Sequence, residues 1–407
     1  MIVTVPKRAA ASTMTTPDAK APVGAVVVGG DYQGLGIVRS LGRRRIPVCV
    51  VDDEKSVARF SRYTTHSVTV PSLRGDRQSV DAILDIGKRL GLRGWLLYPT
   101  RDETVAAIAH HRSELSEFFR VATPGWETVK WAWDKRNTYQ LANELGIPTP
   151  ATWYARCVED LEQVTMDPPF AVKPSVKELF FYATKAKAWR ANDRTQLRAL
   201  FLRAQEVVGP GEVMIQDLIP GDGCQQFAYC AFFKAGEAVG SMVVRRRRQH
   251  PPEFGRASTF VETIELPILE ELSKQFLRAI DYYGLVELEY KLDPRDGKYR
   301  LLDFNGRTWG YHTLGLAAGV DFPYLLFVDQ AGESVPICRA KVGVRWIRLL
   351  TDLPTGLVEI LKGRQDCLAY LRTLKDFDIE SVISREDPLP GLAEVALFPY
   401  LCVRRGF

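Results

Sequence analysis

The 407-residue sequence has little of what marks several large classes of protein. No run of apolar residues approaches the roughly 18 that a membrane-spanning helix needs, so we expect no membrane partner. The seven cysteines are scattered and form no CxxC pair, which argues against a zinc site or a disulfide framework and favours a reducing cytoplasm. Residues 1–22 lack the apolar stretch of a secretory signal, so we interpret them as a disordered leader.

An excess of charge of one sign is also missing. Lys and Arg number 54 and Asp and Glu number 49, which leaves a formal net charge of +5. This mild charge does not predict a nucleic-acid partner, because such a partner requires a concentrated basic face. The apolar fraction of 46% and the charged fraction of 25% are typical of globular proteins, and the length predicts two or three domains.

The segment 23–125 predicts a parallel α/β domain. An apolar run at 23–28 precedes a glycine-rich turn and a helix, and a second run at 46–51 ends in an acidic cluster. Strand, turn, helix and strand form a parallel βαβ unit. Its glycines do not follow the GxGxxG pattern of dinucleotide-binding proteins. The turn could therefore be purely structural, or it could bind an anion or a cofactor. Asp102 and Glu103 follow a third apolar run, where they could face a ligand, although we favour helix capping.

The most informative segment is a predicted hairpin at 286–305. Glu287 and Glu289 alternate along its first strand, and Asp303 and Asn305 along its second, so each pair shares a face. Antiparallel pairing can bring Glu289 beside Asp303 and Asn305. Two carboxylates and an amide oxygen suit Mg²⁺. Acidic residues on an ordinary exposed sheet face are the alternative.

The motifs around this hairpin favour the metal site. In chain order they read Asp134-Lys135, GIPTP, AVKP, IQDLIPG, ELEYK and LDFNGR. Their order and spacing over residues 23–330 resemble the ATP-grasp superfamily. The N-terminal GLGIVRSLG, the RRRRQHPP stretch and the tail with Trp346-Ile347 and Asp387-Pro388 resemble its carboxylate–amine ligase and carbamoyl-phosphate-synthase-like members, including D-aspartate ligase-type proteins.

The resemblance implies an α/β fold, with α+β character in the grasp part. We expect a pre-grasp parallel α/β domain at 23–125 and an ATP-grasp domain at 126–330. The latter holds a small lid near 150–215 and a large antiparallel-sheet domain, with ATP between two antiparallel sheets. Residues 331–407 are expected as an accessory segment packed on the grasp domain.

The resemblance also implies which residues bind ATP. Lys135 matches the first family lysine, near the α-phosphate, and Lys173 matches the second, which bridges phosphate and adenine. A solvated surface lysine is the alternative for each. The hinge whose backbone reads the adenine edge comprises Gln216, Asp217, Leu218 and Ile219. Cations around the phosphates suit phosphoryl transfer, because its catalysis is mostly positioning and charge neutralisation.

The same resemblance implies a metal site and a catalytic arginine. Glu289, Asp303 and Asn305 match the Mg²⁺ ligands, with Mn²⁺ as an alternative, although Asp303 stands where Glu is commoner. Arg307 matches the arginine that steadies the transferred phosphoryl group or the acyl phosphate, a role that suits its planar fork of donors.

One family feature is missing. The segment 174–187 reads PSVKELFFYATKAK, without the glycines that usually cradle phosphates. Lys177, Lys185 or Lys187 could supply cations instead, and we assign Lys187 to ATP binding. A catalytically impaired, ATP-binding protein therefore stays open as an alternative.

The run of arginines at 245–248 has two interpretations. In a strand, Arg246 and Arg248 share a face, which we expect to meet an acidic substrate or the acyl phosphate, while Arg245 and Arg247 are solvated. A nucleic-acid patch is the rival, but no aromatic residues are interleaved. His312 could be a general base, although we favour a packed structural histidine.

These observations predict a ligase that depends on ATP and Mg²⁺. The γ-phosphoryl group passes to a carboxylate, an amine displaces phosphate from the acyl phosphate, and an amide forms. The expected partners are a small-molecule carboxylate and an amine, with a homodimer as an alternative to a monomer. Two alternative functions remain: a catalytically impaired protein that binds ATP, and an enzyme that transfers a carboxyl or carbamoyl group through carboxyphosphate. A nicotinamide-dependent oxidoreductase would leave AVKP, IQDLIPG and LDFNGR unexplained.

Overall fold

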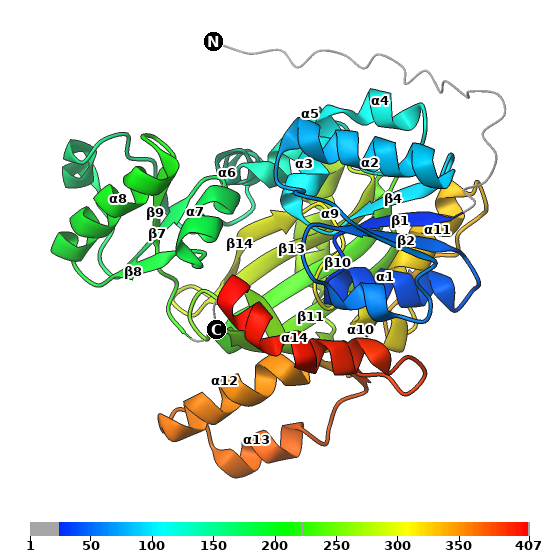
Figure 1. The fold of residues 1–407 in the computed structure, drawn as a ribbon. Coiled ribbons are helices and arrows are strands. Elements are labelled where there is room, and N and C mark those ends of the chain that lie inside the picture. The colour runs from blue at the N-terminus through cyan, green and yellow to red at the C-terminus, as the bar shows by residue number, and fades with distance from the viewer. Residues whose placement is uncertain (1–23, 222, 406–407) are drawn as a thin grey trace.

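The computed structural model describes residues 24–221 and 223–405, so the predicted leader at 1–22 lies outside the described residues. Three sheets with helices packed on them make up the fold (Figure 1). The α/β fold class expected from the sequence is confirmed. Among the described residues, no helix combines the length and the apolar character that crossing a bilayer requires.

Five parallel strands form the N-terminal sheet in the order β3-β2-β1-β4-β5. The central strands are fully buried apolar runs, typical of a sheet covered on both faces. The strands are β1 (Ala25–Val28), β2 (Val48–Asp52), β3 (His66–Thr69), β4 (Leu96–Pro99) and β5 (Arg120–Val121). The helices are α1 (Tyr32–Gly42), η1 (Val57–Phe60), α2 (Asp76–Leu90), α3 (Asp102–His110) and α4 (Arg112–Ser116).

A four-stranded antiparallel sheet, which we call the lid, stands to one side of the other two sheets in Figure 1. Two helices, α5 (Trp126–Trp133) and α6 (Lys135–Glu144), precede it. Its elements are β6 (Thr152–Trp153), η2 (Glu159–Gln163), β7 (Phe170–Pro174), α7 (Lys177–Thr184), β8 (Trp189–Ala191), α8 (Arg194–Val208) and β9 (Val213–Asp217). The lid buries its own apolar cluster, which includes Phe170, Phe180 and Phe201.

The third sheet has eight strands in the order β14-β13-β10-β11-β12-β16-β17, with β15 beside β11. Its first five strands pair antiparallel. They are β10 (Gln226–Lys234), β11 (Glu237–His250), β12 (Ala257–Ile264), β13 (Gly284–Asp293) and β14 (Lys298–Asn305). The other elements of this region are η3 (Gly223–Gln225), α9 (Pro267–Ala279), α10 (Thr313–Ala317) and α11 (Phe322–Gln330).

The segment after residue 330 does more than pack on this sheet. It adds three short strands to it: β15 (Cys338–Arg339), β16 (Arg345–Ile347) and β17 (Ile379–Glu380). Between and after them lie α12 (Leu349–Leu361), α13 (Cys367–Thr373) and α14 (Leu389–Arg405). Helix α14 packs on η1 of the N-terminal sheet, so the end of the chain joins the first sheet to the third.

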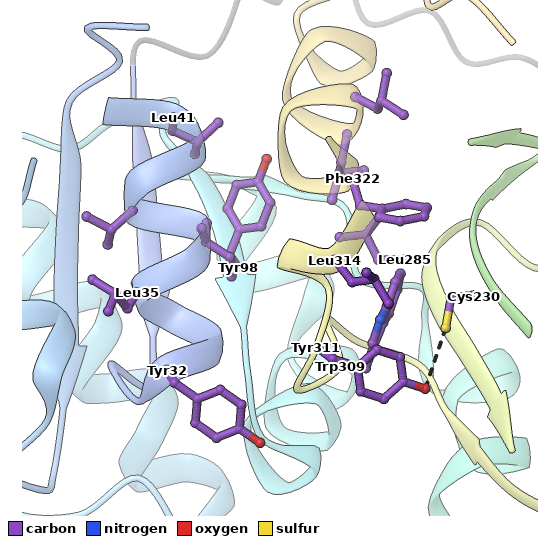
Figure 2. Packing of buried hydrophobic residues seen from close by; sticks show 14 of the residues in the cluster. Tyr32, Leu35, Leu41, Tyr98, Cys230, Leu285, Trp309, Tyr311, Leu314 and Phe322 are labelled. Atoms are coloured by element: carbon purple, nitrogen blue, oxygen red, sulfur yellow. Dashed lines mark hydrogen bonds between the residues drawn. The ribbon is translucent and has the colours of Figure 1, made fainter. Parts of the chain in front are cut away.

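One apolar cluster unites the N-terminal and eight-stranded sheets. Figure 2 shows Leu35 and Tyr98 on one side of this cluster and Trp309 and Phe322 on the other. Gly36 of α1 lies so close to His312 that a Cβ atom there would come within 2.5 Å of the imidazole Nε2. His312 is buried, and the same nitrogen lies 3.0 Å from the Gln33 carbonyl oxygen. These two sheets therefore share one buried core.

We predict that the buried ion pair between Arg39 and Asp387 is important for stability. Arg39 Nε lies 3.0 Å from the Asp387 carboxylate, and both side chains are buried. Asp387 also accepts hydrogen bonds from Ser61 Oγ at 2.7 Å and Arg62 N at 2.9 Å. Removing one partner of a buried pair strands the other charge, so Arg39→Met should lower the free energy of unfolding by about 3–5 kcal/mol, measured by urea denaturation.

The control for this prediction is the neighbouring pair of Arg43 and Glu386. Their contact is also 3.0 Å, but the Glu386 side chain is 64% exposed. Arg43→Met should therefore change the free energy of unfolding by at most about 1 kcal/mol. Equal losses from Arg39→Met and Arg43→Met would contradict the prediction.

Candidate active site

Two pockets adjoin where the three sheets meet. The larger, of about 1210 Å³, lies between the lid and the eight-stranded sheet. The smaller, of about 350 Å³, lies at the carboxyl ends of β1 and β4 and is bordered by α7 and α14. The residues that line both pockets are Lys177, Lys187, Arg246 and Glu289. A group that bridges the two pockets must therefore pass three cations and one carboxylate.

The two predicted ATP lysines line the larger pocket from different elements. Asp134 caps α6 by accepting a hydrogen bond from Arg136 N at 2.9 Å, which places Lys135 at the first helical position. Lys135 Nζ forms an ion pair with Asp303 of β14. Lys173, near the end of β7, donates a hydrogen bond to Tyr139 Oη at 2.8 Å. Burial lowers the pKa of Lys173 to about 8, although Asp303 opposes the shift.

The predicted hinge runs along the same pocket, from the end of β9 into the following loop. Gln216 Nε2 donates to Thr152 Oγ1 at 2.9 Å. The Asp217 carboxylate pairs with Arg295. The Ile219 carbonyl accepts a hydrogen bond from Lys291 Nζ at 2.8 Å. The backbone N–H groups of Asp217 and Leu218 also donate within the protein, to the carbonyls of Ala151 and Pro169. The predicted contact of this backbone with adenine stays a prediction.

The predicted metal ligands lie side by side on β13 and β14. Glu289 is opposite Asp303 and Glu287 is opposite Asn305 in the strand register. The Asn305 amide donates to Glu287 at 3.0 Å and to Glu289 at 3.1 Å. Burial alone would raise the pKa of Asp303, but Lys135 and two further lysines outweigh it and hold that pKa below its usual value.

This donor set fits a hard divalent cation, since it offers two carboxylates and an amide oxygen. Among the described residues, no group of three or more His, Cys, Asp or Glu side chains is placed to hold a metal, so the amide of Asn305 is needed. Its Oδ1 accepts from Arg307 at 3.2 Å. The amide must therefore turn before its oxygen can bind a cation between Glu289 and Asp303.

The arginine run differs from the prediction. Arg246 pairs with Val261 and Arg248 with Phe260, so a β-bulge at Arg247 breaks the alternation along β11. The alternation that we expected for Arg246 and Arg248 is therefore not kept, although both side chains line the larger pocket. Their role toward an acidic substrate or the acyl phosphate stays a prediction. The predicted solvated role of Arg247 fits only in part, because Arg247 is 41% exposed and pairs with Glu262 at 3.1 Å.

The bulge sends the two arginines to different partners. The Arg246 guanidinium lies 2.9 Å from Glu289 Oε2, at the junction of the two pockets. Arg248 forms two hydrogen bonds of 2.8 Å with Asp352 of α12. Arg248 thus fastens α12 to the sheet, and its charge is already neutralised by a buried carboxylate.

Arg307 belongs to a charge cluster that spans three regions. It binds Asp102 of α3 through Nε at 2.8 Å and Nη2 at 2.9 Å. Lys177 of α7 lies 2.5 Å from the same carboxylate. Burial alone would raise the pKa of Asp102, but these two cations hold it well below its usual value. The capping role that we favoured for Asp102 is therefore incomplete, because its carboxylate binds two site cations.

Sequence reasoning missed Glu178, Tyr182 and Tyr311 of the smaller pocket and named Lys177 only as a possible cation. The glycine-free segment forms α7, whose first turn places Lys177 and Glu178 at this pocket. Tyr182 Oη binds Glu103, and Tyr311 Oη binds Glu287. The pattern KELFFYAT at 177–184 could have signalled a helix in place of a loop. Lys185 ends this helix with a left-handed φ of 58°.

The glycine-rich turn after β1 packs on the acidic cluster after β2 and also borders the smaller pocket through Asp31, Tyr32 and Gln33. Gly30 N donates to Asp52 at 2.6 Å, and Arg101 lies 2.6 Å from Asp52 and 2.5 Å from Asp53. In a dinucleotide-binding unit, an acid at this place would bind a ribose. Here the acidic cluster is neutralised within its own domain, which argues against the nicotinamide interpretation.

Comparisons with known proteins agree with this geometry. No family model matches the chain. A D-aspartate ligase of Enterococcus faecium (strain Aus0004) is 25% identical over 301 residues, which cover 69% of this chain and 70% of that protein. The structure of an L-amino acid ligase from Bacillus licheniformis matches with a TM-score of 0.59 and 14% identity, and covers 76% of this chain and 75% of that one.

A further match is the biotin carboxylase domain of the Hydrogenobacter thermophilus 2-oxoglutarate carboxylase, in complex with MgADP, ADP and bicarbonate. Its TM-score is 0.63 at 13% identity, and the match covers 79% of this chain and 73% of that one. The chain therefore has the ATP-grasp fold, and its predicted resemblance to the carboxylate–amine ligases of that superfamily, D-aspartate ligase among them, is confirmed.

Proposed function

We propose that this protein is an ADP-forming ligase that joins a small carboxylate to an amine. Mg-ATP occupies the larger pocket, and the carboxylate occupies the smaller one. The observation that carries the proposal is the junction of the two pockets at Lys177, Lys187, Arg246 and Glu289. A phosphoryl group that crosses this junction is surrounded by cations, as its transfer requires. The D-aspartate ligase and L-amino acid ligase relatives support the same chemistry.

In this proposal the nucleotide is held by the predicted residues of the larger pocket. Lys135, Lys173 and Lys187 bind its phosphates, and the strip from Gln216 to Ile219 borders the adenine. Lys187 is suited to this task, since its ammonium lies near Glu289 and Asp303. Burial lowers the pKa of Lys187, while these carboxylates oppose the shift. A bound phosphate would favour its charged form.

Glu289, Asp303 and Asn305 would hold Mg²⁺, with Mn²⁺ as an alternative. When bound, the cation neutralises phosphate oxygens and orients the nucleotide. The carboxylates that would bind it now pair with Lys135 and Arg246. We infer that these two cations turn toward the phosphates when Mg-ATP binds. Arg246 and Arg307 then stabilise the charge of the transferred group and the acyl phosphate.

The substrate proposal starts from the relatives' names. We propose an amino acid as the carboxylate, with D-aspartate as the first candidate, because the relative at 25% identity is a D-aspartate ligase. The reaction is placed in the cytoplasm, which is supported by seven free cysteines. A homodimer is proposed as the assembly, because the biotin carboxylase domain reported above is described as a dimer.

The test is ADP and phosphate release from Mg-ATP with a panel of carboxylates and amines. The panel includes D-aspartate, other amino acids and bicarbonate. Turnover that requires one carboxylate and one amine supports the ligase. Turnover with bicarbonate alone would favour carboxyphosphate chemistry, and ATP binding without turnover on any combination would favour the impaired form. Asp303→Ala and Asn305→Ala should abolish release, whereas Asp296→Ala, in the hairpin turn and outside both pockets, should not.

The pKa of Lys173 predicts how ATP affinity depends on pH. The free lysine is charged below a pKa of about 8, and phosphate binds the charged form. The affinity should therefore be constant below about pH 8 and fall by up to about tenfold per pH unit above it. Calorimetric titration of Mg-ATP between pH 6.5 and 9.5 measures this. Lys173→Met should bind more weakly throughout and lose the fall; an unchanged fall in that variant would refute the assignment.

A further inference from the structure

We propose that Glu178 is the general base that accepts a proton from the amine substrate. The inference rests on the proposed ligase function, and it adds a catalytic residue and the charge state of the amine. An amine attacks only through its lone pair, yet most amines are ammonium ions at neutral pH. A ligase of this kind therefore needs a proton acceptor on the carboxylate side of the junction.

Glu178 stands at the required place. It lies in the first turn of α7, next to Lys177, which lines both pockets. Glu178 itself lines the smaller pocket and not the larger one. It therefore borders the side from which an amine would approach the acyl phosphate.

Glu178 is partly buried, and one oxygen of its carboxylate is not bonded. Among the described residues, its Oε2 has no hydrogen-bond partner although it is inaccessible to solvent. A buried carboxylate oxygen without a partner is costly. Once the side chain turns to expose this oxygen to the smaller pocket, an ammonium group that donates to it would remove this cost. In this contact the ammonium would donate a hydrogen bond to Oε2. The proton that the amine must lose would then already point at the oxygen that accepts it.

The charges around Glu178 suit proton transfer at neutral pH. Burial raises its pKa to about 7, with Lys177 opposing the shift and Asp102 and Glu103 reinforcing it. Lys177 lies on the same helix, and Asp102 and Glu103 lie on α3. A base whose pKa is close to the working pH combines the ionised form with sufficient proton affinity.

The other groups of the smaller pocket are less suited. Glu287 is held by Tyr311 and by Asn305, and Glu103 is held by Tyr182. His250 Nδ1 lies 2.9 Å from Thr355 Oγ1. Burial and Arg256 lower the pKa of His250 to about 4, so that imidazole is a weak base.

The step balances without another reactant. The ammonium gives one proton to the Glu178 carboxylate, and the neutral nitrogen attacks the acyl-phosphate carbon. A C–N bond forms, and the C–O bond to phosphate breaks with its electron pair on the phosphate. A second nitrogen proton passes to that phosphate. The products are the amide, hydrogen phosphate and a protonated Glu178, which returns its proton to water when the product leaves.

Hydroxylamine separates this role from a structural one, because it is uncharged at neutral pH and needs no base before it attacks. With the carboxylate that supports ADP release, beginning with D-aspartate, Glu178→Gln should lower amide formation at pH 7 by about 100-fold or more. The same variant should still form hydroxamate from hydroxylamine at close to the original rate. The pH dependence should also change: the step near pH 7 disappears, and the rate rises toward the pKa of the amine.

Two variants serve as controls. Glu162→Gln makes the same change at an exposed site of the lid, outside both pockets, and should leave both reactions unchanged. Glu178→Asp keeps a carboxylate and should retain the pH 7 step with a lower rate. Loss of hydroxamate and amide together in Glu178→Gln, or loss of neither, would overturn the inference. No ADP release and no hydroxamate from the unsubstituted protein would overturn the proposed function, and this inference with it.

Discussion

Replacing Arg307 with alanine should slow phosphoryl transfer by about 10³-fold or more, the usual contribution of an arginine that stabilises the transferred group. Arg307 is fixed by two hydrogen bonds to Asp102 and one to Asn305. Burial works against its charged form, but Asp102 outweighs it and raises the pKa, so the guanidinium is always charged. The measurement is single-turnover formation of ADP with the carboxylate in excess.

Two comparisons make the Arg307 result specific. The affinity for Mg-ATP in Arg307→Ala should change little, because Arg307 lines the smaller pocket and not the larger one. Arg307→Lys should recover little of the rate, since a lysine lacks the planar fork that holds Asp102 and Asn305. Arg278→Ala removes an exposed arginine that pairs with Glu237 and should have no effect. A rate within about fivefold of the original in Arg307→Ala would show that this arginine is not part of the chemistry.

Asp303→Asn should have the second large effect, a loss of turnover of about 100-fold or more. Mutating a group that only hydrogen-bonds to a metal ligand already lowers activity or metal affinity by about 10–100-fold. Asp303 is proposed to bind the cation directly, so its loss should cost at least as much. The variant also leaves Lys135 without its ion-pair partner. The concentration of Mg²⁺ that gives half-maximal turnover should rise together with the loss in rate.

The matched control for Asp303→Asn is Asp296→Asn in the turn between β13 and β14. Asp296 pairs with Arg300 at 2.8 Å on the surface of the same hairpin, so the change in charge is identical. Turnover and the Mg²⁺ requirement should both be unchanged in Asp296→Asn. If Asp303→Asn shifts neither quantity, Asp303 does not bind the cation, and the metal assignment fails.

The parts of the site that follow local rules could be predicted from the sequence. Alternation along a strand is a property of neighbouring residues, so it pairs Glu287 with Glu289 and Asp303 with Asn305 on shared faces. Glu289 lies opposite Asp303, however, only because the register of the hairpin shifts at Leu302. The same rule failed for Arg246 and Arg248, because the bulge at Arg247 depends on how β11 pairs with β12. A single sequence contains no direct sign of that pairing.

The cluster around Asp102 could not be predicted for a similar reason. Its members, Asp102, Lys177 and Arg307, come from three regions that are brought together only by the packing of the sheets. The absence of glycine at 174–187 predicted that this segment does not cradle phosphates through a glycine-rich loop. It did not reveal that the segment forms a helix, which supplies side-chain cations where a loop would supply backbone N–H groups.

The close approach of Gly36 to His312 has a consequence for how this protein changes over evolution. Any side chain at position 36 would enter the space of the imidazole. A smaller residue in place of His312 would make room for it but would lose the contact with Gln33. A change at one position alone should therefore disturb the packing of α1 against the segment around His312. In a collection of homologues we therefore expect the two positions to vary together, with a larger residue at 36 accompanied by a smaller one at 312.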